Sequence, residues 1–175
     1  MGQLRYIFFS QPYLLAFLEM ATMYIVWTFL MLLLRGKSGR IVAVICMMIS
    51  LAVIVNLTIV GRSEGGEVVL IPFGTLVKGF AQPNYLRSAF MNILLFSPFG
   101  LTLPYILPDQ IRRKVLFTVL AGMLVSVSVE AVQFLFTIGN TELDDVLMNT
   151  LGAFLGATSW RVYVIIRNKY DTWLR

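Results

Sequence analysis

Five stretches of the sequence are each long and apolar enough to cross a lipid bilayer, which needs about 20 apolar residues. They lie at residues 12–34, 41–60, 88–107, 115–137 and 143–166. A chain that spans a bilayer must pair its own backbone hydrogen bonds, and the sequence lacks the alternation of a transmembrane barrel. It therefore predicts an all-α, polytopic membrane helix bundle of about five transmembrane helices, with residues 1–175 forming a single domain.

Composition agrees with a membrane location, since 58% of the residues are hydrophobic and 13% are charged. Soluble domains are nearer 45–50% apolar and about 25% charged. The stretch at 12–34 is too long for the apolar part of a signal peptide, and no small-residue cleavage site follows it. We expect it to remain as a membrane helix.

The basic residues predict the orientation of the bundle. Ten lie after the first and third stretches or at the C-terminal end: Arg35, Lys37, Arg40, Arg112, Arg113, Lys114, Arg161, Arg167, Lys169 and Arg175. Four lie on the other side: Arg5, Arg62, Lys78 and Arg87. Because short cytoplasmic loops carry the excess of Lys and Arg, the first group is predicted to be cytoplasmic. The N-terminus is then outside and the C-terminus inside. Basic residues spread over short loops in this way do not form a nucleic-acid-binding face.

The one long connection, residues 61–87, is predicted to be external. It contains the apolar run VVLIPF, which includes Pro72, is too short to span and has Gly and Pro on its flanks. A short interfacial helix or a re-entrant segment fits this pattern. The alternative is a loop whose apolar residues rest on the bundle.

Polar side chains inside the apolar stretches are the candidate functional residues, because such groups are expensive in lipid. The predicted ligand-binding set is Arg62, Asn92, Glu130, Gln133, Asp145 and Asn149. At a rise of about 1.5 Å per residue, the members of this set that lie within the apolar stretches are roughly 6–12 Å from the outer end of their helix. Glu19 and Asn56 lie at similar depths. An alternative for the amides is simple packing, since Asn and Gln often hydrogen-bond between membrane helices.

Helical spacing places these residues on two stripes. Gly122, Ser126, Glu130, Gln133 and Thr137 share one face of the fourth stretch, and Asp145, Asn149, Gly152 and Gly156 share one face of the fifth. If the stripes face each other, Gln133 should meet Asp145 and Glu130 should meet Asn149. Gly152 and Gly156 would then let these two helices approach closely.

Other residues have structural interpretations. Thr141 to Asp144 has the spacing of a capping box, with Thr141 as N-cap, so Glu142 and Asp144 are expected to stabilise the start of the fifth helix. Pro98 is predicted to kink the third helix, and Gly100 to pack closely. Cys46 is expected to be a buried packing residue.

Four motifs follow one another between about residues 60 and 157. They are Arg62 with LIPF at 70–73, NILLFSPFGLTLP at 92–104, EAVQ at 130–133 and GNTELDDVLMNTLGAFLG from Gly139. They resemble the signature of VanZ-like membrane proteins: an arginine with I-P-F, N-x-x-L-F-x-P-x-G, E-x-x-Q, and G-x-x-D-x-D-D-x-x-x-N-T-L-G-x-x-x-G. The sequence departs from the family at Glu142, where Asp is common, and at Val69, where Asn is common. The side chain of Glu142 is one methylene longer than that of Asp, which disfavours a tight metal cage. Val69 has no polar side chain, so a hydrogen-bonding role at that position is disfavoured.

The resemblance implies a multi-pass protein of the bacterial plasma membrane, linked to low-level resistance to the lipoglycopeptide antibiotic teicoplanin. It supplies no established catalytic residues, and we predict no cofactor or metal. The first hypothesis is a non-enzymatic protein that binds an amphiphile in an outward-facing polar cavity: a membrane lipid, a lipid-linked peptidoglycan precursor or the antibiotic.

Two other classes of function remain open. One is a membrane enzyme that modifies a lipid-linked envelope substrate, using Glu130 and Asp145 as acid and base, or a divalent cation on Glu142, Asp144 and Asp145. The sequence contains no histidine, which excludes histidine bases, triads and metal sites. The other is a transporter or flippase, which the missing internal repeat disfavours.

Overall fold

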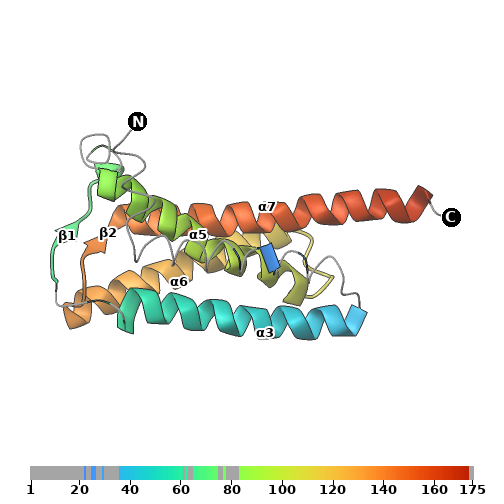
Figure 1. Ribbon diagram of the computed structural model, residues 1–175, viewed down its shortest axis with the longest axis horizontal. Coiled ribbons are helices and arrows are strands. Elements are labelled where there is room, and N and C mark those ends of the chain that lie inside the picture. The colour runs from blue at the N-terminus through green and yellow to red at the C-terminus, as the bar shows by residue number, and fades with distance from the viewer. Residues whose placement is uncertain are drawn as a thin grey trace.

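The computed structural model describes residues 36–60, 62, 65–74, 77 and 83–173, together with 22, 25, 26 and 29. Most of the predicted stretch at 12–34, including Glu19, lies outside the described residues. The elements are α3 (Gly36–Val55), η1 (Asn56–Val60), β1 (Val68–Val69), α5 (Pro83–Ile106), α6 (Lys114–Phe136), β2 (Thr141–Glu142) and α7 (Leu143–Trp173) (Figure 1).

Three of the described helical segments are long and apolar enough to cross a membrane: Ser38–Val60, Tyr85–Ile106 and Lys114–Phe136. They correspond to the predicted second, third and fourth stretches. The predicted fifth stretch is helical and lies within the 31 residues of α7, but α7 does not qualify by the same measure. Its first turn holds Asp144 and Asp145, and its C-terminal part holds further charges. Five spanning helices are therefore not confirmed.

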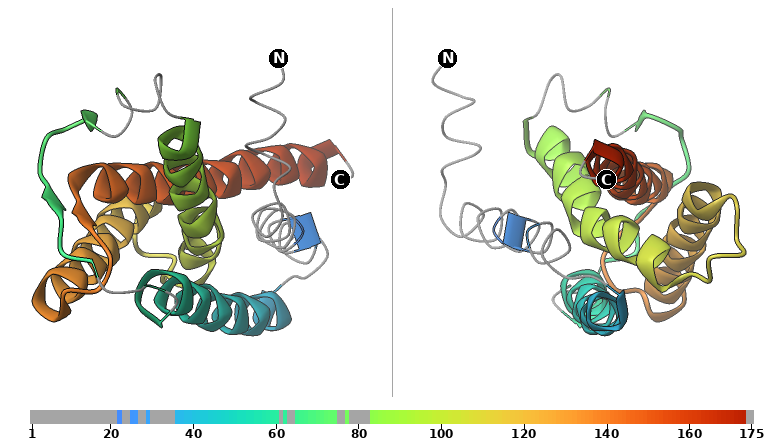
Figure 2. Two further views of the ribbon diagram at one scale, coloured as in Figure 1. Left: turned by 60° about the vertical axis from the view of Figure 1, so that its left-hand side comes forward. Right: turned by 90° about the vertical axis from the view of Figure 1, so that its right-hand side faces the viewer.

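The helix α5 occupies the middle of the bundle, between α3 and α7 (Figure 2). Glycines bring α5 and α7 into backbone contact. A Cβ at Gly152 would overlap the Ile93 carbonyl, and one at Gly156 the Ser97 carbonyl. These two glycines were expected to face the preceding helix, and that expectation is wrong: the face that they form lies against α5.

The same interface explains Gly100, where a Cβ would overlap the carbonyl of Ala153 on α7. The helix α5 continues through both Pro98 and Pro104. Proline lacks an N–H and interrupts the backbone ladder, and membrane helices tolerate it when hydroxyl groups and neighbouring helices compensate. Next to Pro98, the Ser97 hydroxyl donates to the Ile93 carbonyl at 2.7 Å, and the Thr102 hydroxyl donates to the Pro98 carbonyl at 2.8 Å.

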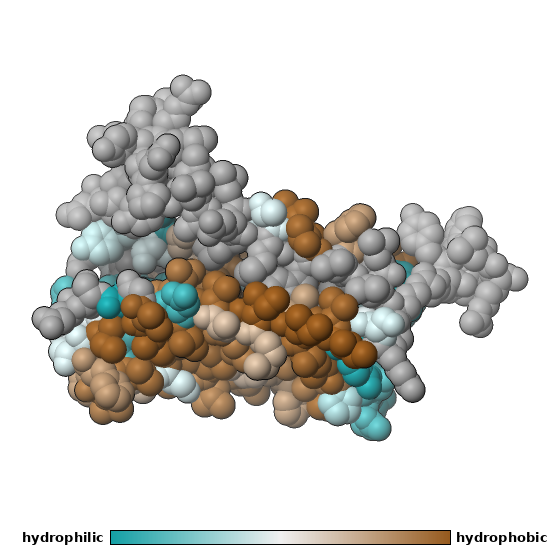
Figure 3. Space-filling view, turned by 60° about the horizontal axis from the view of Figure 1, so that its bottom comes forward, coloured by the Kyte–Doolittle hydropathy of each residue, from teal (hydrophilic) through white to brown (hydrophobic). Residues whose placement is uncertain are grey.

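An apolar core lies between the helices, and an apolar surface faces outward. Phe96, Phe99 and Ala153 are at the centre of the core, with Cys46 buried nearby on α3. Figure 3 shows that hydrophobic side chains cover most of the visible described surface. Exposed residues such as Ile41 on α3 and Leu124 on α6 belong to it. A surface of this kind fits lipid as its surroundings.

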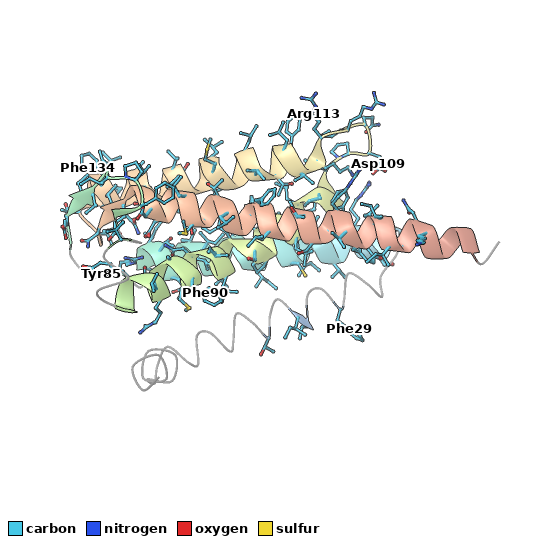
Figure 4. All side chains as sticks on the ribbon, turned by 90° about the horizontal axis from the view of Figure 1, so that it is seen from above. Phe29, Tyr85, Phe90, Asp109, Arg113 and Phe134 are labelled. Atoms are coloured by element: carbon cyan, nitrogen blue, oxygen red, sulfur yellow. The ribbon has the colours of Figure 1, made fainter. Side chains whose placement is uncertain are left out.

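The two ends of the bundle differ in chemistry. The strand end, formed by residues 62, 65–74 and 137–145, carries the parallel pair β1 and β2, with Val68 opposite Thr141 and Val69 opposite Glu142. The basic end carries the connection at 107–113, where Asp109 lies within 4 Å of both Arg40 (3.7 Å) and Lys114 (3.0 Å). Figure 4 shows Asp109 and Arg113 at this end and Phe134 and Tyr85 at the other.

Residues 65–74, which we call the strap, run along the connection between α6 and α7. Gly65 donates to the Thr137 carbonyl at 3.1 Å, and Gly66 donates to the Gly139 carbonyl at 2.8 Å. In the strap, Leu70, Ile71 and Phe73 are 64%, 69% and 54% exposed. These apolar side chains do not rest on the bundle, so the loop alternative is wrong for them. An interfacial or re-entrant conformation stays a prediction, because much of 75–82 lies outside the described residues.

Candidate functional site

Four of the six predicted site residues come together at the strand end. Arg62 follows η1, Asn92 lies on α5, Glu130 on α6 and Asp145 on α7. The three helical residues are each at most 7% exposed. Side chains from four separate segments therefore meet in one buried cluster, which we call the polar cluster.

The ion pair between Arg62 and Asp145 crosses the cluster. A guanidinium nitrogen of Arg62 lies 3.9 Å from a carboxylate oxygen of Asp145, and the two side chains are 34% and 9% exposed. The stem of Arg62 lies over Gly139, where a Cβ would be 3.2 Å from its Cδ. Gly139 also has φ = +66°, a conformation that glycine adopts without strain. A side chain at position 139 would thus disturb both the turn and the arginine.

Asn92 lies beside this ion pair. Its side chain interacts with the Asp145 carboxylate. The contact is electrostatic, because the buried Asn92 amide nitrogen makes no hydrogen bond of good geometry. We therefore treat Asn92 as a neighbour of Asp145 with hydrogen-bonding capacity to spare.

Glu130 has a backbone partner. One of its carboxylate oxygens accepts a hydrogen bond from the Glu142 N–H at 2.9 Å. Glu142 immediately precedes α7, and a carboxylate is favourable where a helix presents its first N–H groups. Glu130 also lies within electrostatic range of Arg62 and Asp145. It thus joins the start of α7 to the ion pair.

The other two predicted residues hold the helices around the cluster. The Gln133 amide donates to the Thr58 carbonyl in η1 at 2.7 Å, and the Asn149 amide donates to the Ser126 hydroxyl at 2.8 Å. The two stripes therefore meet at Asn149 and Ser126 only in part, since the glycines of the α7 stripe face α5, and the predicted register is wrong. Asn149 meets Ser126 instead of Glu130, about one helical turn away.

The start of α7 also differs from the predicted capping box. Thr141 and Glu142 form β2 opposite the strap, so α7 begins at Leu143 and Thr141 is not its N-cap. Asp144 has a role that the sequence did not reveal: its carboxylate accepts a hydrogen bond from the Phe73 N–H at 2.6 Å. Phe73 has φ = +59°, which is uncommon for a bulky residue. Nothing in the sequence indicates that conformation.

Some buried polar atoms make no hydrogen bond. Within the described residues, the buried side-chain atoms without a hydrogen-bond partner are Ser50 Oγ, Asn92 Nδ2, Gln133 Oε1 and Asn149 Oδ1. The last three belong to the predicted site. Leaving a buried polar group unpaired costs about 1–3 kcal/mol. Three amides of the predicted set therefore keep unused hydrogen-bonding capacity.

The carboxylates do not form a metal cage. In the part of the chain that the structure describes, no three Cys, Asp or Glu side chains lie close enough together to hold a metal ion. Asp144 instead binds the strap, and Glu142 contributes its N–H to Glu130. The cation version of the enzyme hypothesis therefore receives no geometric support.

The fold and the site define an α-helical membrane protein with a buried polar cluster at one end. Comparison with known families gives the particular class: the sequence model of the VanZ/LLP1 family matches residues 41–166, and the chain belongs to that family. It is 35% identical over 78 residues to Protein VanZ of Enterococcus faecium, a match that covers 44% of this chain and 46% of that protein. The matched region thus spans less than half of that relative. No solved structure matches the chain.

Two residues at which this chain departs from the family pattern lie close together in the structure. Val69 and Glu142, which differ from the residues common in the family, are opposite each other in the β1–β2 pair. Both differences therefore fall at one place, where the strap meets the start of α7.

Proposed function

We propose that the chain is a VanZ-type protein of the bacterial plasma membrane that lowers sensitivity to teicoplanin by engaging an amphiphile at its strand end. The observation that carries the proposal is the Arg62–Asp145 ion pair with the Asn92 amide beside it, together with the unpaired amide oxygens of Gln133 and Asn149 on the helices around the cluster. Polar groups of a ligand would satisfy hydrogen bonds that the protein leaves unmade.

Charge supports an external position for this end. Arg112, Arg113, Lys114 and Arg161 all line one pocket at the basic end. The strand end has Arg62 among the carboxyl groups of Glu130, Glu142, Asp144 and Asp145. Under the positive-inside rule the basic end is cytoplasmic, so the strand end faces the side on which a lipoglycopeptide acts.

Apolar side chains beside the cluster support an amphiphilic ligand. Leu70, Ile71 and Phe73 are exposed on the strap, and the Phe73 N–H is held by Asp144 next to Asp145. A lipid, a lipid-linked precursor or the antibiotic has an apolar chain for such a surface and a polar head for the cluster. The strap would then supply the apolar part of the site next to the polar cluster.

Two sets of substitutions test the proposal in cells challenged with teicoplanin. Asp145→Asn removes the ion pair, and Glu130→Gln removes a negative charge while keeping an acceptor for the Glu142 N–H. We expect both to abolish protection at unchanged protein level. Ser128→Ala is the control on the same helix, because Ser128 is exposed and donates only to Leu124 of its own helix. Unchanged protection in both site variants would reject the polar cluster as the functional site.

One observation favours an enzyme, namely that the carboxyl groups of Glu130 and Asp145 lie close to each other. Two neighbouring carboxyl groups can act as acid and base on a lipid-linked substrate. That function predicts chemically altered wall precursors in cells that express the protein, and their loss in Asp145→Asn. Precursors of unchanged mass in protected cells would favour binding alone.

A further inference from the structure

A pocket of about 690 Å³ lies at the basic end, on the far side of the bundle from the polar cluster. Its wall comes from the connection at 109–113, the first turns of α6 and one side of α7. Three arginines line it: Arg112, Arg113 and Arg161. The same pocket is lined by the apolar side chains of Leu116, Val119 and Phe154. It therefore joins a cationic part and an apolar part in one cavity.

Lys114 belongs to the frame of this pocket. Its amine donates to the carbonyls of Leu107 at 2.9 Å and Pro104 at 3.3 Å, and to the Asp109 carboxylate at 3.0 Å. The same amine lies 5.7 Å from the centre of the Trp160 ring. Lys114 thus ties the end of α5, the connection and α7 together, and its charge is already matched.

The three arginines retain their charge for a ligand. In the described chain, none of Arg112, Arg113 and Arg161 is within ion-pair distance of a carboxylate. The pocket's carboxyl group, Asp109, is occupied by Lys114 and Arg40, and the Lys114 hydrogen bond holds its pKa below the usual value. Guanidinium groups bind phosphate through paired hydrogen bonds, which makes them the preferred partners of that group.

The apolar wall opens toward the lipid-facing surface. Leu116 and Phe154 are 46% and 45% exposed, on α6 and α7 respectively. A free phosphate would use the arginines and leave this wall unused, whereas a phospholipid would use both. Basic pockets between membrane helices on the cytoplasmic side are suited to anionic head groups.

We propose that this pocket binds one anionic phospholipid of the cytoplasmic leaflet. Its phosphate contacts Arg112, Arg113 and Arg161, and an acyl chain lies along Leu116, Val119 and Phe154. This site is separate from the polar cluster and does not depend on the function proposed for it. A bound lipid would fix the connection between α5 and α6 against α7.

Native mass spectrometry of the full chain, released from nanodiscs of equal parts phosphatidylglycerol and phosphatidylcholine, tests this proposal. We expect one retained phosphatidylglycerol per protein. Arg161→Gln and Arg113→Gln should each weaken its retention about tenfold or more, because each removes charge-assisted hydrogen bonds. Lys169→Gln is the matched control, since it removes the same charge from α7 outside the pocket. Melting temperatures verify that each variant is folded.

Three results would overturn the proposal. Equal retention of both lipids would show that the head group is not recognised. Equal loss in Lys169→Gln and Arg161→Gln would show a general effect of basic charge near the membrane. Displacement of the lipid by millimolar inorganic phosphate, with no dependence on acyl chain length, would show a site for a free anion.

Discussion

Glu130 shows how a residue's interpretation changes once its partner is known. In the sequence it is a carboxyl group inside an apolar helix, and Glu142 and Asp144 are the residues assigned to stabilising the next helix. In the structure Glu130 accepts from Glu142 at the start of α7, and Asp144 holds Phe73 of the strap. Glu130 therefore has a structural role in addition to any role in binding.

Two substitutions separate these roles. Glu130→Ala leaves the Glu142 N–H without its acceptor and should destabilise the protein by about 1–3 kcal/mol. Glu130→Gln keeps an acceptor oxygen at the same length and should be less destabilising, although it removes the negative charge. Thermal unfolding in detergent measures the difference. Equal melting temperatures for the two variants would contradict the role assigned to the Glu142 hydrogen bond.

The packing of α5 against α7 depends on glycines of α7. The sequence predicted that these glycines allow close helix packing, but against α6 instead of α5. Gly156→Ala places a Cβ against the Ser97 carbonyl, so the two backbones must separate. We expect a loss of about 1–3 kcal/mol in the free energy of unfolding, as for other overpacked interfaces.

Gly74→Ala is the control for this prediction, because its Cβ would meet Ile71 at 3.5 Å, an ordinary contact. Urea or thermal unfolding in detergent compares the two variants with the parent protein. A Gly156→Ala protein as stable as the Gly74→Ala protein would show that α5 and α7 are not packed as closely as described.

The strap depends on the side chain of Asp144. Asp144→Ala removes the acceptor of the Phe73 N–H, whose positive φ is unfavourable without support. We expect faster hydrogen exchange across residues 65–74 and little change within α6. Glu67→Ala is the control, since Glu67 is exposed and contributes its backbone carbonyl, not its side chain, to Thr141. Unchanged exchange in Asp144→Ala would contradict the role given to this contact.

The elements could be predicted from hydropathy, whereas their mutual arrangement could not. The stretches at 41–60, 88–107 and 115–137 are all helical, since apolar length alone decides this. The stripes on α6 and α7 followed from helical spacing, but their register against each other did not. The pairing of Val68 with Thr141 joins segments far apart in the chain, and no local pattern specifies it.

The burial of polar side chains was predictable residue by residue, whereas their contacts were not. Buried polar side chains in apolar helices are rare enough to identify Asn92, Gln133 and Asn149 one by one. Their partners, Thr58 for Gln133 and Ser126 for Asn149, required the packing of three helical segments. The contact between Asp144 and Phe73 required a backbone conformation that phenylalanine seldom adopts.

Taken as a whole, the molecule has an acidic strand end and a basic opposite end, which predicts its direction in the membrane. Cysteines introduced at Glu67 and at Gln110 would lie exposed at opposite ends, while the native Cys46 is buried. In intact cells, a maleimide that cannot cross membranes should label position 67 and not position 110. Labelling of 110 alone, or a reporter at Arg175 found outside the cell, would reverse the orientation and remove the proposed external site.

The most direct measurement is binding of an amphiphile to the purified protein in nanodiscs, with teicoplanin and a lipid-linked peptidoglycan precursor offered separately. The account predicts that at least one of them binds the parent protein. Asp145→Asn should weaken that binding about tenfold or more at an unchanged melting temperature, since Arg62 is exposed enough to be solvated. Equal binding to both proteins, or no binding of either compound to the parent, would contradict the account.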